Sequence, residues 1–185
     1  MNSGYSNWWA SFIHKIAAPL AAGNVPYELV GGRAGLVHVE EKDPSQSMLT
    51  RDVDLMIRRA DMDRVIAIAA ERGFRFRHAA GPDMLLYGDS ESARNSVHLL
   101  FSGEKVRPSQ ATPNPDISPV LKSIHGEDVS GTPLADLLRM KLSSWRLKDQ
   151  VHVQVMDAAG LITPLVEHSL NEELQARLAH VRASD

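Results

Sequence analysis

The segment MLTRDVDLMIRR, residues 48–59, contains the pattern from which the fold can be predicted. Its apolar residues alternate with polar ones, as in a half-buried β-strand, at Val53, Leu55 and Ile57. Asp52 and Asp54 are also two residues apart, so on a strand both carboxylates project from one face. Carboxylates this close repel each other unless a cation lies between them or one is protonated. The segment therefore predicts either a strand with a cation site or an edge strand whose acidic face pairs with nearby arginines.

The composition limits the classes of protein that this chain can represent. It has 185 residues, 43% of them hydrophobic and 23% charged, which is typical of one globular domain or one domain with a small helical appendage. The net charge of −3 provides no strong field for nucleic acid or an anionic membrane. The chain has no cysteine, which excludes disulfides, cysteine-ligated zinc and thiol nucleophiles.

Targeting signals are not evident in the sequence. The N-terminal residues lack a basic segment followed by an apolar core and a small-residue cleavage site. No apolar run is long enough to span a bilayer. We therefore expect a cytoplasmic protein without a membrane partner.

Helices and strands alternate through the first part of the chain. The periodicity predicts helices over residues 8–22, 33–41 and 61–73. It predicts strands over residues 26–32, 48–59, 74–80, 83–89 and 96–101. This order indicates an α/β or α+β fold, in which a mixed β-sheet is flanked by helices.

The composition changes after this sheet region. Five prolines interrupt residues 102–133, so we interpret this stretch as a long connection that acts either as a lid or as a linker. The remainder of the chain has a helical pattern. We predict an α/β core over residues 1–104, a Pro-rich connection over 105–132 and a C-terminal helical region over 133–185.

A second motif precedes the acidic strand. In ELVGGRAG, Gly31 and Gly32 stand where a strand is expected to turn into a helix. Such a turn allows backbone N–H groups to approach a phosphate closely, and the helix N-terminus favours the anion. Taken alone, the pair is equally compatible with a tight turn that binds no ligand.

The two motifs together resemble the nucleotidyltransferase superfamily typified by DNA polymerase β. The sequence looks closest to the bacterial branch that includes the enzyme half of AbiE-type (type IV) toxin–antitoxin systems. The resemblance rests on Gly31 and Gly32 after an apolar strand, and on Asp52 and Asp54 preceded by Thr50. It extends over roughly residues 25–161, and only these two motifs are specific.

The resemblance implies a function for these residues. The glycines and Thr50 would contact a nucleoside triphosphate, and Asp52 and Asp54 would bind Mg²⁺ or Mn²⁺. The reaction would be metal-dependent transfer of a nucleoside monophosphate to a hydroxyl acceptor, which is a protein, an RNA or a small molecule. A cognate antitoxin would be a further partner.

A basic helix also fits the resemblance. The family often carries a lysine in an apolar helix, followed by an Arg/Lys–Asp pair, and this chain has RMKLSSWRLKDQVHVQVMD, residues 139–157. We expect Lys141 to face the triphosphate and to share one helix face with Trp145 and Lys148. For Lys148 and Arg146 we favour a solvated basic stripe.

The chain departs from the family at the third carboxylate. His98 stands at the expected acidic position in NSVHLLFSG, while Asp89 and Glu91 fall in a predicted turn and are poor substitutes. His98 can act as the general base, or as a metal ligand that favours Mn²⁺ or Zn²⁺, or as a half-buried histidine without a catalytic role. In the last case, the protein would be a catalytically degenerate nucleotide-binding or regulatory module. A second histidine, His152, replaces a frequent aspartate, and for it we expect a structural role.

Overall fold

The computed structural model describes residues 3–48, 50, 52–78, 83–88, 96–124 and 126–184. The turn that was predicted to contain Asp89 and Glu91 lies outside these residues. Within the described residues, no helix is both long enough and apolar enough to cross a membrane.

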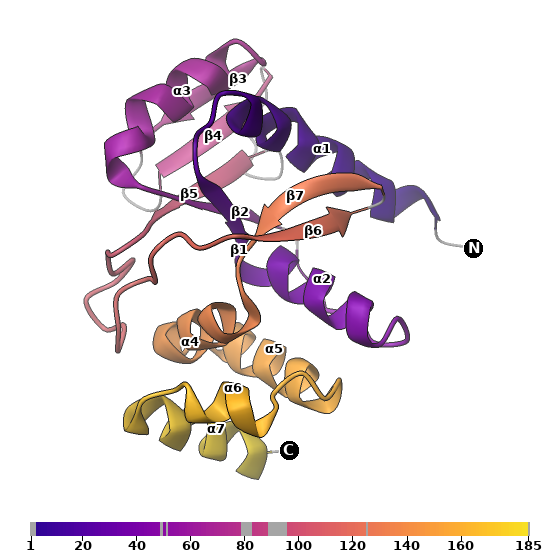
Figure 1. The fold of residues 1–185 in the computed structure, drawn as a ribbon, viewed down its shortest axis with the longest axis vertical. Helices are drawn as coiled ribbons and strands as arrows, with labels where there is room; N and C mark the ends of the chain where they lie inside the picture. The colour runs from indigo at the N-terminus through magenta and orange to yellow at the C-terminus, as the bar shows by residue number, and fades with distance from the viewer. Residues whose placement is uncertain are drawn as a thin grey trace.

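The chain forms helices and strands in nearly the predicted order (Figure 1). The helices are α1 (Ser3–Ala22), α2 (Gly31–Lys42), the 3₁₀ turn η1 (Arg59–Asp61), α3 (Met62–Ala70), α4 (Leu134–Ser144), α5 (Leu147–Ala158), α6 (Pro164–His168) and α7 (Glu172–Ala183). The strands are β1 (Tyr27–Val30), β2 (Val53–Ile57), β3 (Phe74–Arg77), β4 (Asp83–Tyr87), β5 (Ser96–Phe101), β6 (Val120–Ile124) and β7 (Glu127–Gly131).

Across the described residues, the strands form one seven-stranded sheet in the order β3-β4-β5-β2-β1-β7-β6. The sheet is mixed, because β2 pairs with β5 and β1 with β7 in parallel, while the other neighbours are antiparallel. Asp54 is opposite Val30 on β1 and opposite His98 on β5. The predicted fold class, a mixed sheet flanked by helices, is confirmed.

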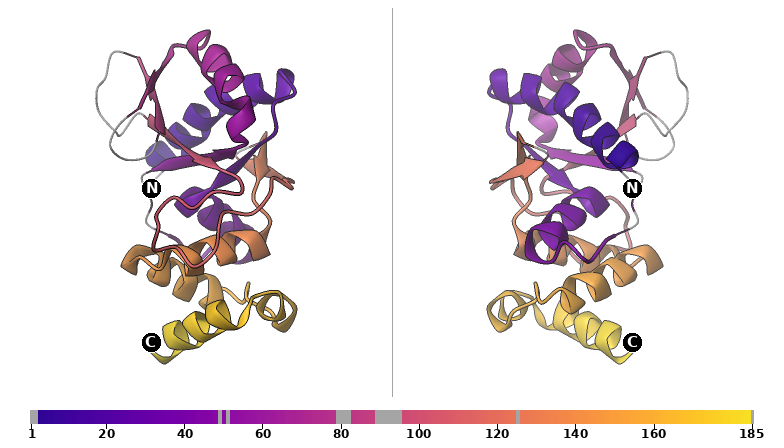
Figure 2. Two further views of the ribbon diagram at one scale, coloured as in Figure 1. Left: turned by 90° about the vertical axis from the view of Figure 1, so that its left-hand side faces the viewer. Right: turned by 90° about the vertical axis from the view of Figure 1, so that its right-hand side faces the viewer.

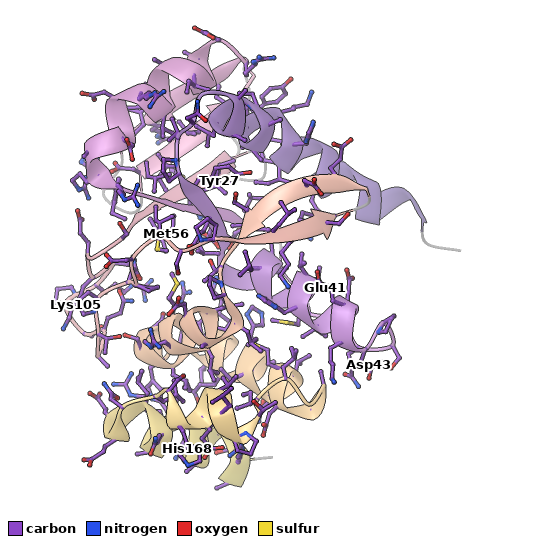
Figure 3. All side chains as sticks on the ribbon, viewed as in Figure 1. Tyr27, Glu41, Asp43, Met56, Lys105 and His168 are labelled. Carbon is purple, nitrogen blue, oxygen red and sulfur yellow. The ribbon has the colours of Figure 1, made fainter. Side chains whose placement is uncertain are left out.

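Successive residues of β2 point to opposite faces of the sheet. Val53, Leu55 and Ile57 are buried in the main core, to which α1 also contributes its apolar side chains. The alternate residues point to the opposite face, because side chains alternate along a strand. There Met56, labelled in Figure 3, packs in a smaller cluster with Val30, Ile117 and Met140.

Residues 105–132 contain two strands that we did not expect from the sequence. β6 and β7 form a hairpin that extends the sheet beyond β1. The alternation was hard to detect because both strands have five residues, and β6 is largely exposed at the sheet edge. The predicted division of the chain at residues 104 and 132 stays a prediction.

The rest of the connection, residues 102–119, is a packed segment that we call the strap. Hydrogen bonds within the strap stabilise its conformation, since the Gln110 side-chain oxygen accepts hydrogen bonds from the backbone N–H groups of Val106 and Arg107. Its end is held by the sheet, since the Ser118 N–H donates to Glu28 on β1. The strap therefore lies against the second face of the sheet, between β5 and α4 (Figure 1).

The C-terminal helices form the end of the molecule that is farthest from α1 and α3 (Figure 2). α4 ends at Ser144 because Trp145 has a left-handed backbone, with φ of +56°. The Trp145 ring packs against His180 and Arg177 of α7, which favours this break over a continuous helix. Lys148 therefore lies on α5, and the expected shared helix face of Lys141, Trp145 and Lys148 is wrong.

Candidate active site

The two glycines lie where β1 turns into α2. Gly31 has φ of +70°, and a Cβ at this position would collide with the Asp54 carboxylate. A Cβ on Gly32 would likewise collide with the Thr50 hydroxyl. The first N–H groups of α2 receive no side-chain cap, since the N-cap residue is Val30. Uncapped N–H groups are thus close to a carboxylate and a hydroxyl.

Asp54 and His98 come together on the second face of the sheet, and Asp52 lies just before β2. Asp54 Oδ1 lies 3.2 Å from His98 Nδ1, and both side chains are about four-fifths buried. Asp52 precedes the first residue of β2 and is 45% exposed, with its Oδ2 3.5 Å from Lys148 Nζ. Each carboxylate therefore has a basic side chain beside it.

The environment of His98 favours its protonated form. The hydrogen bond with Asp54 raises the pKa of His98, and the negative charges of Asp54 and Asp52 add to this effect. Burial and the charge of Lys148 lower the pKa of His98, but the net direction is upward. When it is protonated, the imidazole is a counter-ion for Asp54 and has no nitrogen lone pair left to accept a further proton.

Lys141 is buried beneath α2. Its residue is 3% exposed, and its Nζ lies 3.0 Å from Nδ1 of His152 on α5. Burial lowers the pKa of Lys141 to about 8, although the negative charges of Asp149 and Asp54 oppose this effect. A Cβ on Gly32 would be 3.3 Å from His152 Cε1, so the pair lies directly against the glycine turn.

The start of α5 carries an ion pair between a buried carboxylate and a partly exposed arginine. Asp149 is 4% exposed, and its carboxylate accepts two hydrogen bonds from Arg146, at 2.6 and 3.3 Å. Burial raises the pKa of Asp149, but Arg146 and the charge of Lys141 outweigh it, so the pKa lies below its usual value. Arg146 therefore has a defined partner, and so does Lys148 through Asp52.

All of the predicted site residues fall in this one region of the structure. Gly31 lies against Asp54, and Gly32 lies against Thr50. Asp54 is in turn beside His98, because β2 pairs with β5. His152 was not among them. Its contact with Lys141 depends on how α4 and α5 pack after the break at Trp145, which no local pattern in the sequence indicates.

The donor set fits a hard divalent cation that is held in part by other ligands. Within the described residues, no group of three or more His, Cys, Asp or Glu side chains is arranged to hold a metal ion. Two carboxylates are nevertheless a sufficient protein contribution for Mg²⁺, which retains waters and binds substrate phosphates. Because Gly31 has no side chain, the Asp54 carboxylate can lie directly against the start of α2.

The mixed sheet flanked by helices is also the fold of solved structures of nucleotidyltransferase-like proteins. The sequence matches no protein-family model and no curated protein, whereas solved structures match over nearly the whole chain. An antigenic nucleotidyltransferase-like protein from Paracoccidioides brasiliensis has a TM-score of 0.62 at 17% identity, over 97% of this chain and 89% of that chain.

Two structures of the antibiotic-resistance factor ANT(2'')-Ia also match. Its solution structure has a TM-score of 0.56 at 16% identity, over 97% of this chain and 94% of that chain. Its crystal structure in complex with adenylyl-2''-tobramycin has a TM-score of 0.51 at 16% identity, over 95% of this chain and 98% of that chain. These likenesses support the predicted superfamily at the level of the fold, and the closer resemblance to the AbiE-type branch stays a prediction.

Proposed function

We propose that this protein is a metal-dependent nucleotidyltransferase that transfers a nucleoside monophosphate from a nucleoside triphosphate to a hydroxyl acceptor. The observation that carries the proposal is the approach of the glycine turn to Asp54, which leaves no space for a side chain at Gly31. Uncapped N–H groups at the start of α2 suit phosphate oxygens, and the adjacent carboxylates suit the cation that accompanies them.

In the proposed reaction, the acceptor oxygen forms a bond to the α-phosphorus. The bond from that phosphorus to the β-phosphate oxygen breaks, and pyrophosphate leaves with the electron pair. The N–H groups of Gly31 and Gly32 bind the phosphate chain, Thr50 contacts it beside them, and Lys141 offsets its charge. Asp52 and Asp54 hold Mg²⁺ or Mn²⁺, which when bound neutralises phosphate charge and lowers the pKa of the acceptor hydroxyl.

His98 is the candidate general base, because the resemblance implies that the residue at this position acts on the acceptor. As a neutral imidazole, it takes the proton of the acceptor hydroxyl on Nδ1 or Nε2. A second candidate function follows from its observed pairing, because a protonated His98 bound to Asp54 is a poor base. In that case the protein binds nucleotide without transferring it, as a regulatory module of the same fold.

The acceptor belongs to one of three classes, namely protein, RNA or small molecule. The complex of ANT(2'')-Ia with adenylyl-2''-tobramycin supports including small molecules with hydroxyl groups. The resemblance to the AbiE-type branch supports including macromolecular acceptors and a cognate antitoxin. We propose that the protein acts in the cytoplasm.

The test is incubation with each α-labelled nucleoside triphosphate, with Mg²⁺ or Mn²⁺, against cell lysate, total RNA and a panel of aminoglycosides. We expect label on one acceptor class with the wild type, and none with the Asp52→Asn/Asp54→Asn variant. Asp63→Asn, an exposed carboxylate on α3, is the control for removal of a charge and should label as the wild type does. Nucleotide binding without labelling would support the regulatory module, and no binding would refute both.

A further inference from the structure

Lys141 and His152 form a buried polar pair that joins α4 to α5. Both residues are less than one-tenth exposed, and their nitrogens are 3.0 Å apart. An ammonium has three donors and no acceptor, so His152 Nδ1 must accept this hydrogen bond. His152 is therefore neutral, with its proton on Nε2.

The carboxylates near Lys141 are hydrogen-bonded to other side chains. Asp149 is held by Arg146, and Asp54 is paired with His98. Asp149 and Asp54 act on Lys141 through their charge alone. Among the described residues, His152 is the side chain that accepts a hydrogen bond from Lys141. A buried ammonium without an acceptor is strongly unfavourable, so the orientation of Lys141 depends on His152.

The pair lies against the part of α2 that would hold phosphate. His152 Cε1 is 3.3 Å from where a Gly32 Cβ would be, and Lys141 Cε is 3.4 Å from the same point on Gly35. The positive end of α2 and a buried ammonium are thus close together, and the Asp54 carboxylate at Gly31 is an anion that acts on both. An anionic ligand at the glycine turn would stabilise both.

We propose that His152 is a positioning residue, whose hydrogen bond holds the Lys141 ammonium at the glycine turn for the phosphate chain of the nucleotide. This inference rests on the proposed function of the site. It adds a residue that touches no substrate and acts through Lys141. It also predicts that the affinity for phosphate depends on the hydrogen-bond acceptor of the His152 side chain and not on the size of that side chain.

Two substitutions separate the acceptor from the volume. His152→Asn retains an acceptor near the place of Nδ1, whereas His152→Leu fills the same space without one. The matched control is His38→Leu, because His38 is also buried and makes one hydrogen bond, to the Thr132 carbonyl at 2.8 Å. All three variants should remain folded, which thermal unfolding checks.

The first measurement is calorimetric binding of inorganic tripolyphosphate and of the nucleoside triphosphate, both without metal. We expect His152→Leu to weaken both ligands on the order of tenfold, the effect of one hydrogen bond to a charged group. His152→Asn and His38→Leu should stay within about threefold of the wild type. Equal weakening in His38→Leu, or none in His152→Leu, would overturn the inference.

The second measurement needs no ligand. The chemical shift of the Lys141 ¹³Cε, measured by NMR, reports whether the lysine is protonated. The charges of Asp149, Asp54, Arg146 and Lys148 also act on the pKa of Lys141. Loss of the acceptor in His152→Leu should lower the pKa of Lys141 further, and His152→Asn should restore it. An unchanged titration in His152→Leu would show that His152 does not hold Lys141. If the titration moves but the wild type binds neither ligand, the proposed function fails together with the role toward phosphate, although the hydrogen bond itself is real.

Discussion

One face of the central sheet carries Val53, Leu55 and Ile57 of β2, whereas the other carries Asp54 and Met56 of the same strand. The first face belongs to a large apolar core. The second face holds titratable groups from three adjacent strands, Glu28, Asp54 and His98. The same backbone therefore supports tight packing on one side and a charged site on the other.

This difference shows how the fold tolerates a costly site. Buried charges destabilise a protein unless each is paired or hydrogen-bonded. Here Asp54 is paired with His98, and Lys141 is bonded to His152. The apolar face supplies the stability, and the second face supplies the chemistry.

The largest effect should come from truncating the apolar face. Leu55 is completely buried in the main core, so Leu55→Ala should lower the free energy of unfolding by about 3 kcal/mol, through lost burial and a new cavity. Urea denaturation measures this change. Leu100→Ala is the matched substitution on the second face, where Leu100 is only partly buried, and about 1 kcal/mol is expected. An equal or larger loss at Leu100 would contradict the division of roles between the faces.

The next effect is the pH dependence caused by Lys141, whose pKa falls from 10.5 to about 8 on folding. Below pH 8 the lysine is protonated in both states, and its burial destabilises the folded state. Between these two values the unfolded chain binds the proton more tightly, so the stability of the wild type rises with pH. Relative to Lys141→Met, the wild type should gain about 3 kcal/mol between about pH 7 and pH 10.5.

Urea denaturation of both proteins across this pH range gives the difference. Lys148→Met removes an exposed lysine of the next helix and controls for the loss of one positive charge. A constant difference between wild type and Lys141→Met would mean that Lys141 is less constrained than its buried position indicates.

Most of the fold could be predicted because its signals are local. Alternation over 53–57 predicted β2, on which Asp54 lies, whereas Asp52 lies just before the strand. The position of His98 beside Asp54 was expected from the resemblance, and in the structure His98 lies opposite Asp54 in the pairing of β2 with β5. β6 and β7 were missed because their stability comes from pairing with β1 and with each other.

Within the site, only the residues that belong to a local sequence pattern could be predicted. The glycine turn and the acidic pair each have a local pattern. The Lys141–His152 contact depends on the break at Trp145, which the packing of its ring against α7 stabilises. Tertiary contacts of this kind leave no trace in local periodicity, so a continuous helix was predicted there.

A smaller effect is expected from the glycine turn. Gly31→Ala should lower the free energy of unfolding by roughly 2 kcal/mol, because alanine is disfavoured at φ of +70° and its Cβ would displace Asp54. Gly160→Ala is a close control, since Gly160 has the same φ and no atom within 4 Å of a Cβ. The excess loss at Gly31 over Gly160 measures the collision at the site. No excess would mean that Asp54 moves away without cost.

The smallest effect concerns Glu28, the buried carboxyl on the second face. Burial raises the pKa of Glu28, the N–H of Ser118 and the hydroxyl of Thr132 lower it, and the charge of Asp136 raises it further. Because the folded pKa lies above the unfolded value, the stabilisation is present at low pH and is lost as pH rises through the folded pKa. Glu28→Gln keeps an acceptor for Ser118 but has no charge, so it should gain stability over the wild type between about pH 4 and pH 7. Thermal unfolding of both proteins at several pH values measures this gain. If the gain is absent, Glu28 is solvated as a carboxylate, and the second face is more open to water than its burial indicates.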